Sequence, residues 1–235
     1  ASTLCGRYLA GEGGVGKTRL AAALAERIKA FPGFASPILT ARAQKYRQVR
    51  FSVPADLLAD YLGLKLSAGQ SAFYDALSAL PGVDESEAAR VAAIFSPSGS
   101  NRSEADSSLS LFTVFQAILN RYASSIYPAL FIIDDASAMD NQSRDFLSYL
   151  FHNAKVKPFV IMAGRDQPQA LRDAFPDLKA YKLGPLSQEE AKALVLSLWP
   201  ECTDSFLEMI QSQAGGNPLF IREYTLFASK NKDLS

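Results

Sequence analysis

Two kinds of hydrophobic pattern follow one another along this chain: short, nearly continuous apolar runs, and longer stretches whose apolar residues recur every three or four positions. The first pattern is typical of buried strands, and the second of amphipathic helices. The runs predict strands at 7–10, 37–43, 129–133, 159–163 and 180–186. The helical spacing predicts helices at 20–31, 55–64, 71–80, 84–95, 111–122, 140–151 and 171–175. This succession of strands and helices predicts an α/β fold with a mainly parallel sheet.

The pattern becomes entirely helical after residue 186. Ser187 and Glu190 have the spacing of a capping box, which predicts the start of a helix, and a second helix is predicted over 203–214. We therefore expect a core over 1–186 and a helical lid subdomain over 187–235.

A third helix is predicted to close this subdomain. Asn217 stands at its cap position and Pro218 at its first helical position, where proline is favoured. We expect four large apolar residues on its buried face: Leu219, Phe220, Tyr224 and Phe227.

The stretch from Gly11 to Thr18 carries the clearest chemistry. It fits G-x-x-x-x-G-K-[ST], the phosphate-binding P-loop, and it stands between a predicted strand and a predicted helix as that motif requires. In such a loop, backbone N–H groups and the helix N-terminus face phosphate oxygens. Lys17 would contact the β- and γ-phosphates and act in catalysis, and Thr18 would bind Mg²⁺. The expected nucleotide-binding residues are Gly11, Gly13, Gly14, Val15, Gly16, Lys17, Thr18 and Arg19. The alternative is a glycine-rich turn that only caps a helix.

An acidic pair follows the apolar run 129–133. Asp134 and Asp135 would stand at the carboxyl end of a buried strand, where open α/β sheets bind their ligands, so the pair matches a Walker B element. We expect Asp134 to hold Mg²⁺, mostly through water, and Asp135 to act as the catalytic base or orienter of the attacking water. The alternative is an acidic turn without a catalytic role.

The apolar run 159–163 ends in Gly164 and Arg165. An arginine at this edge of the sheet could reach the γ-phosphate and take part in catalysis, or it could pair with Asp166. Another basic stretch, 44–51, is interpreted either as a contact patch for phosphate or a partner, or as a solvated loop.

Composition limits the remaining possibilities. Lys plus Arg and Asp plus Glu number 24 each, so no overall positive charge suggests nucleic-acid binding. The two cysteines do not form a disulfide framework. Without a long apolar run or a signal peptide, we expect no membrane contact and a cytoplasmic location. The chain begins almost at its first strand, so we also expect it to be part of a longer protein.

Five features stand in one order: the P-loop, the Asp134-Asp135 strand end, the strand ending in Arg165, Leu-Gly-Pro-Leu-Ser at 183–187 and Gly-Asn-Pro-Leu-Phe at 216–220. Together they resemble the STAND class of AAA-like P-loop NTPases, closest to the ATPase domains fused to LuxR-type regulators and class III adenylate cyclases. The resemblance implies a three-layer α/β/α core whose five-stranded, mainly parallel sheet has the order 5-1-4-3-2. It also implies that Pro218 packs near adenine and that Arg165 is the sensor-strand arginine.

The resemblance implies an ATP/ADP-binding signalling switch with slow Mg²⁺-dependent hydrolysis. Its partners would be regulatory and output domains of the same longer protein, with ATP-dependent self-association. The alternative function is an oligomeric AAA-type motor or loader acting on DNA or protein, for which Arg144 and Arg172 are candidate trans arginine fingers. A degenerate domain serving as a scaffold is disfavoured by the presence of Lys17, Thr18 and Asp134.

Overall fold

Five parallel strands form a single sheet in the computed structural model, which describes residues 5–44, 51–96 and 104–230. The strands are β1 (Cys5–Ala10), β2 (Ile38–Arg42), β3 (Leu130–Asp134), β4 (Phe159–Gly164) and β5 (Lys179–Lys182). Their order is β2-β3-β4-β1-β5, and each neighbouring pair is parallel. This is the predicted order viewed from the opposite edge, so the fold prediction is confirmed.

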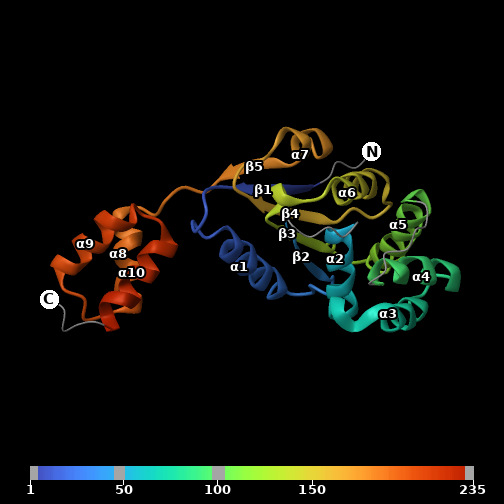
Figure 1. The fold of residues 1–235 in the computed structure, drawn as a ribbon, viewed down its shortest axis with the longest axis horizontal. Coiled ribbons are helices and arrows are strands. Elements are labelled where there is room, and N and C mark those ends of the chain that lie inside the picture. Colours follow the sequence, from blue (N-terminus) through green and yellow to red (C-terminus); the bar gives the residue numbers. More distant parts are fainter. Residues whose placement is uncertain (1–4, 45–50, 97–103, 231–235) are drawn as a thin grey trace.

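Helices cover both faces of the sheet, because β1, β3 and β4 carry apolar residues on both sides. On one face α1 (Lys17–Lys29) packs its alanines against Leu9, Ile132 and Ile161. The opposite face holds the larger core, around Tyr8, Phe131 and Met162. Its helices are α2 (Ser52–Leu62), α3 (Gly69–Ser78), α4 (Glu85–Ala92), α5 (Glu104–Asn120), α6 (Asn141–Asn153) and α7 (Gln169–Ala174). Figure 1 shows α1 and α6 on opposite sides of the strands.

Short 3-10 turns and side-chain caps complete these elements. The turns are η1 (Leu66–Ala68), η2 (Ala93–Phe95) and η3 (Ala136–Ala138). Asp140 caps α6 by accepting the N–H of Ser143 at 2.7 Å. Ser187 and Glu190 form the predicted capping box of α8 (Gln188–Leu198), which confirms that this helix starts as predicted.

The last three helices, α8 (Gln188–Leu198), α9 (Asp204–Ala214) and α10 (Pro218–Lys230), pack around their own apolar cluster. Val195, Ile210 and Ile221 are fully buried in it. In Figure 1 this three-helix unit stands to one side of the sheet, and an extended linker joins it to β5.

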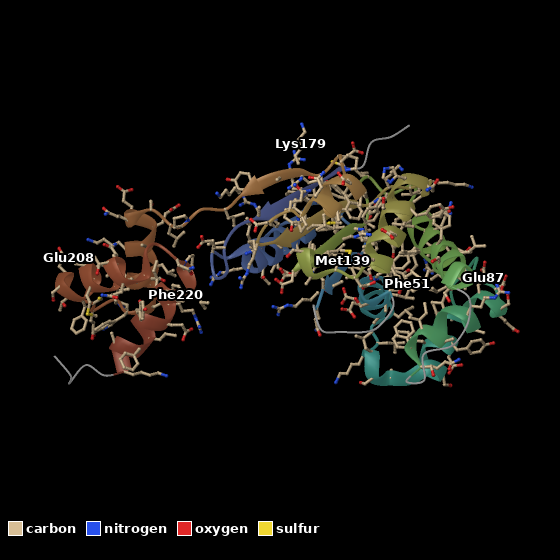
Figure 2. The ribbon with its side chains drawn as sticks, turned by 45° about the horizontal axis from the view of Figure 1, so that its top comes forward. Phe51, Glu87, Met139, Lys179, Glu208 and Phe220 are labelled. Atoms are coloured by element: carbon tan, nitrogen blue, oxygen red, sulfur yellow. The ribbon has the colours of Figure 1, made fainter. Side chains whose placement is uncertain are left out.

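The prediction of which face of α10 is buried is wrong. Leu219, Phe220, Tyr224 and Phe227 are 42–68% exposed, and the buried residues of this helix are Ile221, Thr225 and Ala228. The two stripes adjoin on the helix surface, and the one with smaller side chains allows α8 and α9 to approach α10 closely. Figure 2 labels Phe220 on this unit.

Within the described part of the chain, no helix combines the length and apolar character needed to cross a bilayer. The basic residues Lys45, Arg47 and Arg50 of the predicted contact patch lie outside the described residues.

Candidate nucleotide-binding site

The P-loop connects the carboxyl end of β1 to the N-terminus of α1. Gly14 (φ 84°) and Gly16 (φ 97°) adopt left-handed conformations that favour glycine. Gly16 is the N-cap of α1, and the space beside its Cα is open. A loop of this shape, leading into a helix N-terminus, presents backbone N–H groups to an anion.

Lys17 lies inside this loop and is 8% exposed. Its Nζ donates to the carbonyl oxygens of Gly11 at 2.8 Å and Glu12 at 2.7 Å. The N–H of Gly11 donates to the carbonyl of Arg165 at 2.9 Å, which ties the loop to the end of β4. The ammonium group is therefore held at the centre of the loop, where a phosphate would bind.

Thr18 and Asp134 join the P-loop to the end of β3. The Thr18 hydroxyl donates to Oδ2 of Asp134 at 2.8 Å, while Oδ1 of Asp134 accepts the N–H of Asp135 at 3.0 Å. Both side chains can thus face one cation beside the loop. A hydroxyl and a carboxylate are ligands suited to Mg²⁺, which retains several waters in such sites.

Asp135 is held in an unusual way. Its backbone is left-handed (φ 51°), which is uncommon for a residue other than glycine and occurs often at functional sites. Its carboxylate forms an ion pair with Arg42, with Nε and an Nη each within 2.9 Å of Oδ2. Hydrogen bonding to Asp135, and then the charges of Asp135 and Asp134, raise the pKa of Arg42. The candidate base is therefore paired with a cation at the end of β2.

Arg165 follows β4 directly and is exposed. Its guanidinium lies 3.8 Å from where a Cβ on Gly13 would stand, so it reaches the P-loop. In the described residues no ion pair joins Arg165 to Asp166. The carbonyl of Asp166 instead accepts the hydroxyl of Tyr8 at 2.5 Å.

Tyr8 contacts the end of β4 from within the core. Its side chain is fully buried, and its hydroxyl occupies the space that a Cβ on Gly164 would need, 2.1 Å away. Burial, and then the charges of Asp166 and Asp135, raise the pKa of Tyr8 to about 12. A neutral tyrosine therefore anchors the loop that carries Arg165.

The N-terminus of α10 contacts the P-loop. The side-chain amide of Asn217 donates to the carbonyl of Gly13 at 2.9 Å, and the N–H of Leu219 lies 3.3 Å from the carbonyl of Gly14. Pro218, the predicted adenine neighbour, stands between these two residues at the start of α10. The three-helix unit thus meets the core at the loop itself.

The other predicted residues occupy less specific places. Val15 is buried within the loop and Arg19 is exposed on the first turn of α1. Arg144 on α6 bonds Asp145 and Asn141, and Arg172 on α7 bonds Gln169 and the carbonyl of Gln167.

Sequence reasoning missed three contributors: Arg42, Tyr8 and Asn217 as a P-loop contact. Arg42 could have been found, because it stands one residue before the end of the strand predicted at 37–43 and therefore lies at the same sheet edge as Asp134. For Tyr8 and Asn217 the sequence held no comparable indication, since both act through backbone carbonyls of distant segments.

Comparison with known proteins agrees with this geometry. The family model "AAA ATPase domain" matches residues 3–162. Comparison with curated proteins gives no match.

Solved structures share the fold at low identity. The chain is similar to the Aeropyrum pernix ORC2 protein (12% identity, TM-score 0.57) and to the Thermotoga maritima RuvB Holliday junction branch migration motor (15%, 0.51). It is also similar to a Pyrococcus horikoshii STAND protein with a tetratricopeptide repeat sensor (17%, 0.51). These matches cover 94%, 97% and 93% of this chain, but only 54%, 54% and 27% of the other chains.

With a family model matching well over half of its residues and a complete P-loop at the edge of the sheet, the chain belongs to the AAA ATPase domain family of P-loop NTPases.

Proposed function

We propose that this domain is an ATP/ADP-dependent signalling switch with slow Mg²⁺-dependent hydrolysis, whose output lies in other domains of a longer protein. The observation that carries the proposal is the Arg42–Asp135 ion pair, with distances of 2.8 and 2.9 Å. The Asp135 oxygen that accepts both guanidinium N–H groups is less available to accept a hydrogen bond from an attacking water. This engagement slows turnover by a modest factor, which suits a domain that retains its nucleotide.

The remaining residues have distinct roles in this proposal. Lys17 and the N–H groups of the P-loop bind the phosphates, Thr18 and Asp134 hold Mg²⁺, and Asp135 orients or deprotonates the attacking water. The metal ion would neutralise charge on the phosphate oxygens when bound. Arg165 contacts the γ-phosphate, which is present in only one of the two nucleotide states.

The two nucleotide states can shift a conformational equilibrium only through contacts that differ between them. We propose that residues 187–235 act as a lid on a core formed by 1–186, and that Pro218 packs near the adenine. In support of this division, α8–α10 have their own buried cluster and touch the core at the P-loop. Regulatory domains, output domains of the kind linked to transcription or cyclase activity, and ATP-dependent self-association would complete the switch in a cytoplasmic protein.

A motor or loader is the competing function, since the fold is also that of RuvB, which is described as a branch migration motor. A motor needs an arginine finger for a neighbouring subunit. Arg144 and Arg172, the candidates, are both hydrogen-bonded to acceptors of their own segments, which favours the switch.

Turnover measurements test the proposal. We expect tight binding of ADP and ATP, and hydrolysis far below the 1–100 s⁻¹ typical of phosphoryl-transfer enzymes such as kinases. Brisk hydrolysis stimulated by DNA would instead identify a motor.

The P-loop assignment has its own test. We expect Lys17→Ala to weaken nucleotide binding roughly 10- to 100-fold, because a hydrogen bond to a charged group contributes about 1.5–3 kcal/mol. The matched control is Lys29→Ala in the same helix, where the lysine pairs with Glu26 on the surface. Equal affinities for these two variants would remove the assignment.

A further inference from the structure

Four consecutive carbonyl groups of the P-loop are hydrogen-bonded, and the donors come from two different places. Lys17 donates to Gly11 and Glu12, from within the loop. The carbonyls of Gly13 and Gly14 instead accept from Asn217 and Leu219 at the start of α10, more than 200 residues later in the sequence. Two of the four hydrogen bonds that fix the orientation of this loop therefore come from the lid.

The orientation of these carbonyls determines where the neighbouring N–H groups point. In a planar trans peptide, the C=O of one residue and the N–H of the next point in opposite directions. Holding the Gly13 carbonyl toward the lid therefore turns the N–H of Gly14 to the opposite side, and the Gly14 carbonyl does the same for Val15. Successive N–H groups turned to one side of such a loop form an anion-binding concavity.

The contact between Asn217 and the loop is close and specific. A Cβ on Gly14 would lie 2.6 Å from Oδ1 of Asn217 and 2.8 Å from Cβ of Leu219, so only glycine permits this approach. Oδ1 of Asn217 accepts the N–H of Leu219 at 3.0 Å, so this N–H is shared with the Gly14 carbonyl at 3.3 Å, while the amide nitrogen of Asn217 donates to Gly13. One side chain thus caps α10 and binds the P-loop.

The turn that carries Asn217 is fixed on its other side as well. The N–H of Leu186, in the linker after β5, donates to the carbonyl of Gly216 at 2.8 Å. A Cβ on Gly216 would lie 2.6 Å from the carbonyl oxygen of Leu186. Movement of the lid about this linker would therefore be transmitted directly to the Asn217 contact.

We propose that Asn217 is a positioning residue of the phosphate site, and that lid docking and phosphate binding stabilise each other through its bond to the Gly13 carbonyl. The inference rests on the proposed nucleotide binding but differs from an adenine contact, because it requires no base. By linkage, the docked lid tightens phosphate binding by the same factor by which bound phosphate favours the docked lid.

The test uses a ligand without a base. Calorimetric titration with Mg²⁺·tripolyphosphate and with Mg²⁺·ATP is compared for the wild type and Asn217→Ser. Serine is also a good helix cap, but its side chain is too short to reach the Gly13 carbonyl while it caps α10, and the change is neutral in charge. The matched control is Asn153→Ser, since Asn153 also donates its amide to a backbone carbonyl, that of Tyr149, on α6.

We expect Asn217→Ser to weaken both ligands by the same factor, roughly 3- to 10-fold as for one neutral hydrogen bond, and Asn153→Ser to weaken neither. Tripolyphosphate should also protect the 183–187 linker from limited proteolysis in the wild type, and less so in Asn217→Ser. Loss of ATP affinity alone would show that Asn217 acts through the base and would overturn the inference. Unchanged binding of both ligands would overturn it while leaving the proposed function intact. If the wild type binds neither ligand, both this inference and the proposed function are contradicted.

Discussion

Arg42 at the end of β2 and Asp135 after β3 form a two-nitrogen ion pair on one carboxylate oxygen, at 2.9 and 2.8 Å. The two strands are neighbours in the sheet, and Arg42 lies opposite Asp134 in their register. The two acidic residues of the site therefore contact different partners. Asp134 contacts Thr18 of the P-loop, and Asp135 contacts Arg42 of β2, an outer strand of the sheet.

Removing the arginine should release Asp135. In Arg42→Ala we expect ATP hydrolysis to rise by no more than about fivefold, because exposed ion pairs contribute about 1 kcal/mol or less. The two side chains are 67% and 44% exposed, so salt should weaken the pair. Single-turnover hydrolysis at low and high salt measures both effects. At high salt the hydrolysis rate of the wild type should approach that of Arg42→Ala. Asp135→Asn should abolish hydrolysis in either background, whereas slower hydrolysis in Arg42→Ala would contradict an inhibitory role.

Thr18 and Asp134 make a separate prediction about Mg²⁺. We expect Thr18→Ala to lower ATP affinity when Mg²⁺ is present and to leave it nearly unchanged in EDTA, because the hydroxyl contacts the Asp134 carboxylate and its proposed role is to bind the metal rather than a phosphate. The measured quantity is the ratio of the two dissociation constants. The control is Thr113→Ala, a threonine of α5 whose hydroxyl bonds only the backbone of Leu109 among the contacts described. Equal losses of ATP affinity with and without Mg²⁺ would contradict a role of Thr18 in binding the metal.

Much of the core could be predicted because the patterns that indicate it lie within short stretches of the sequence. The P-loop motif is contiguous, the apolar runs of β3 and β4 mark buried strands, and polar residues directly after such strands must meet at one edge of a parallel sheet. The same rule would have placed Arg42 beside Asp135, had it been applied to the end of the second strand.

The three-helix unit α8–α10 shows what local sequence patterns cannot predict. In α10 the residues Phe220 and Tyr224 have helical spacing, as do Ile221 and Thr225 one position further on. Periodicity alone cannot choose between two adjoining apolar stripes, since the choice depends on how closely α8 and α9 approach. The Asn217–Gly13 contact was equally inaccessible, because it joins a side chain to a backbone carbonyl in another part of the chain.

The exposed and buried stripes of α10 predict different stabilities. Ile221 is fully buried, so Ile221→Ala should lower the free energy of unfolding by about 2–4 kcal/mol. Phe220 is 50% exposed, so Phe220→Ala should cost much less although it removes a larger side chain. Urea unfolding followed by circular dichroism measures both. A larger loss for Phe220→Ala would show that the aromatic stripe is the buried one, as the sequence alone predicted.

Tyr8 predicts a dependence of stability on alkaline pH. Its pKa of about 12 in the folded protein lies above the unfolded value of 10.0, so the unfolded chain loses its proton first. Below pH 10 both states are protonated, and Tyr8 adds no pH dependence. Between pH 10 and 12 the folded state retains the proton, and the free energy of unfolding should fall by about 1.4 kcal/mol per pH unit on account of this group.

The comparison variant for this prediction is Tyr8→Phe, which lacks the titrating hydroxyl and its bond to Asp166. We expect it to be less stable than the wild type by about 1 kcal/mol near neutral pH, the contribution of one hydrogen bond. Its stability should then decline less steeply above pH 10, because the other tyrosines and the lysines titrate equally in both proteins. Denaturant unfolding from pH 8 to 11.5 gives the two curves. Parallel curves over this range would show that the Tyr8 hydroxyl is not held neutral beneath the Arg165 loop.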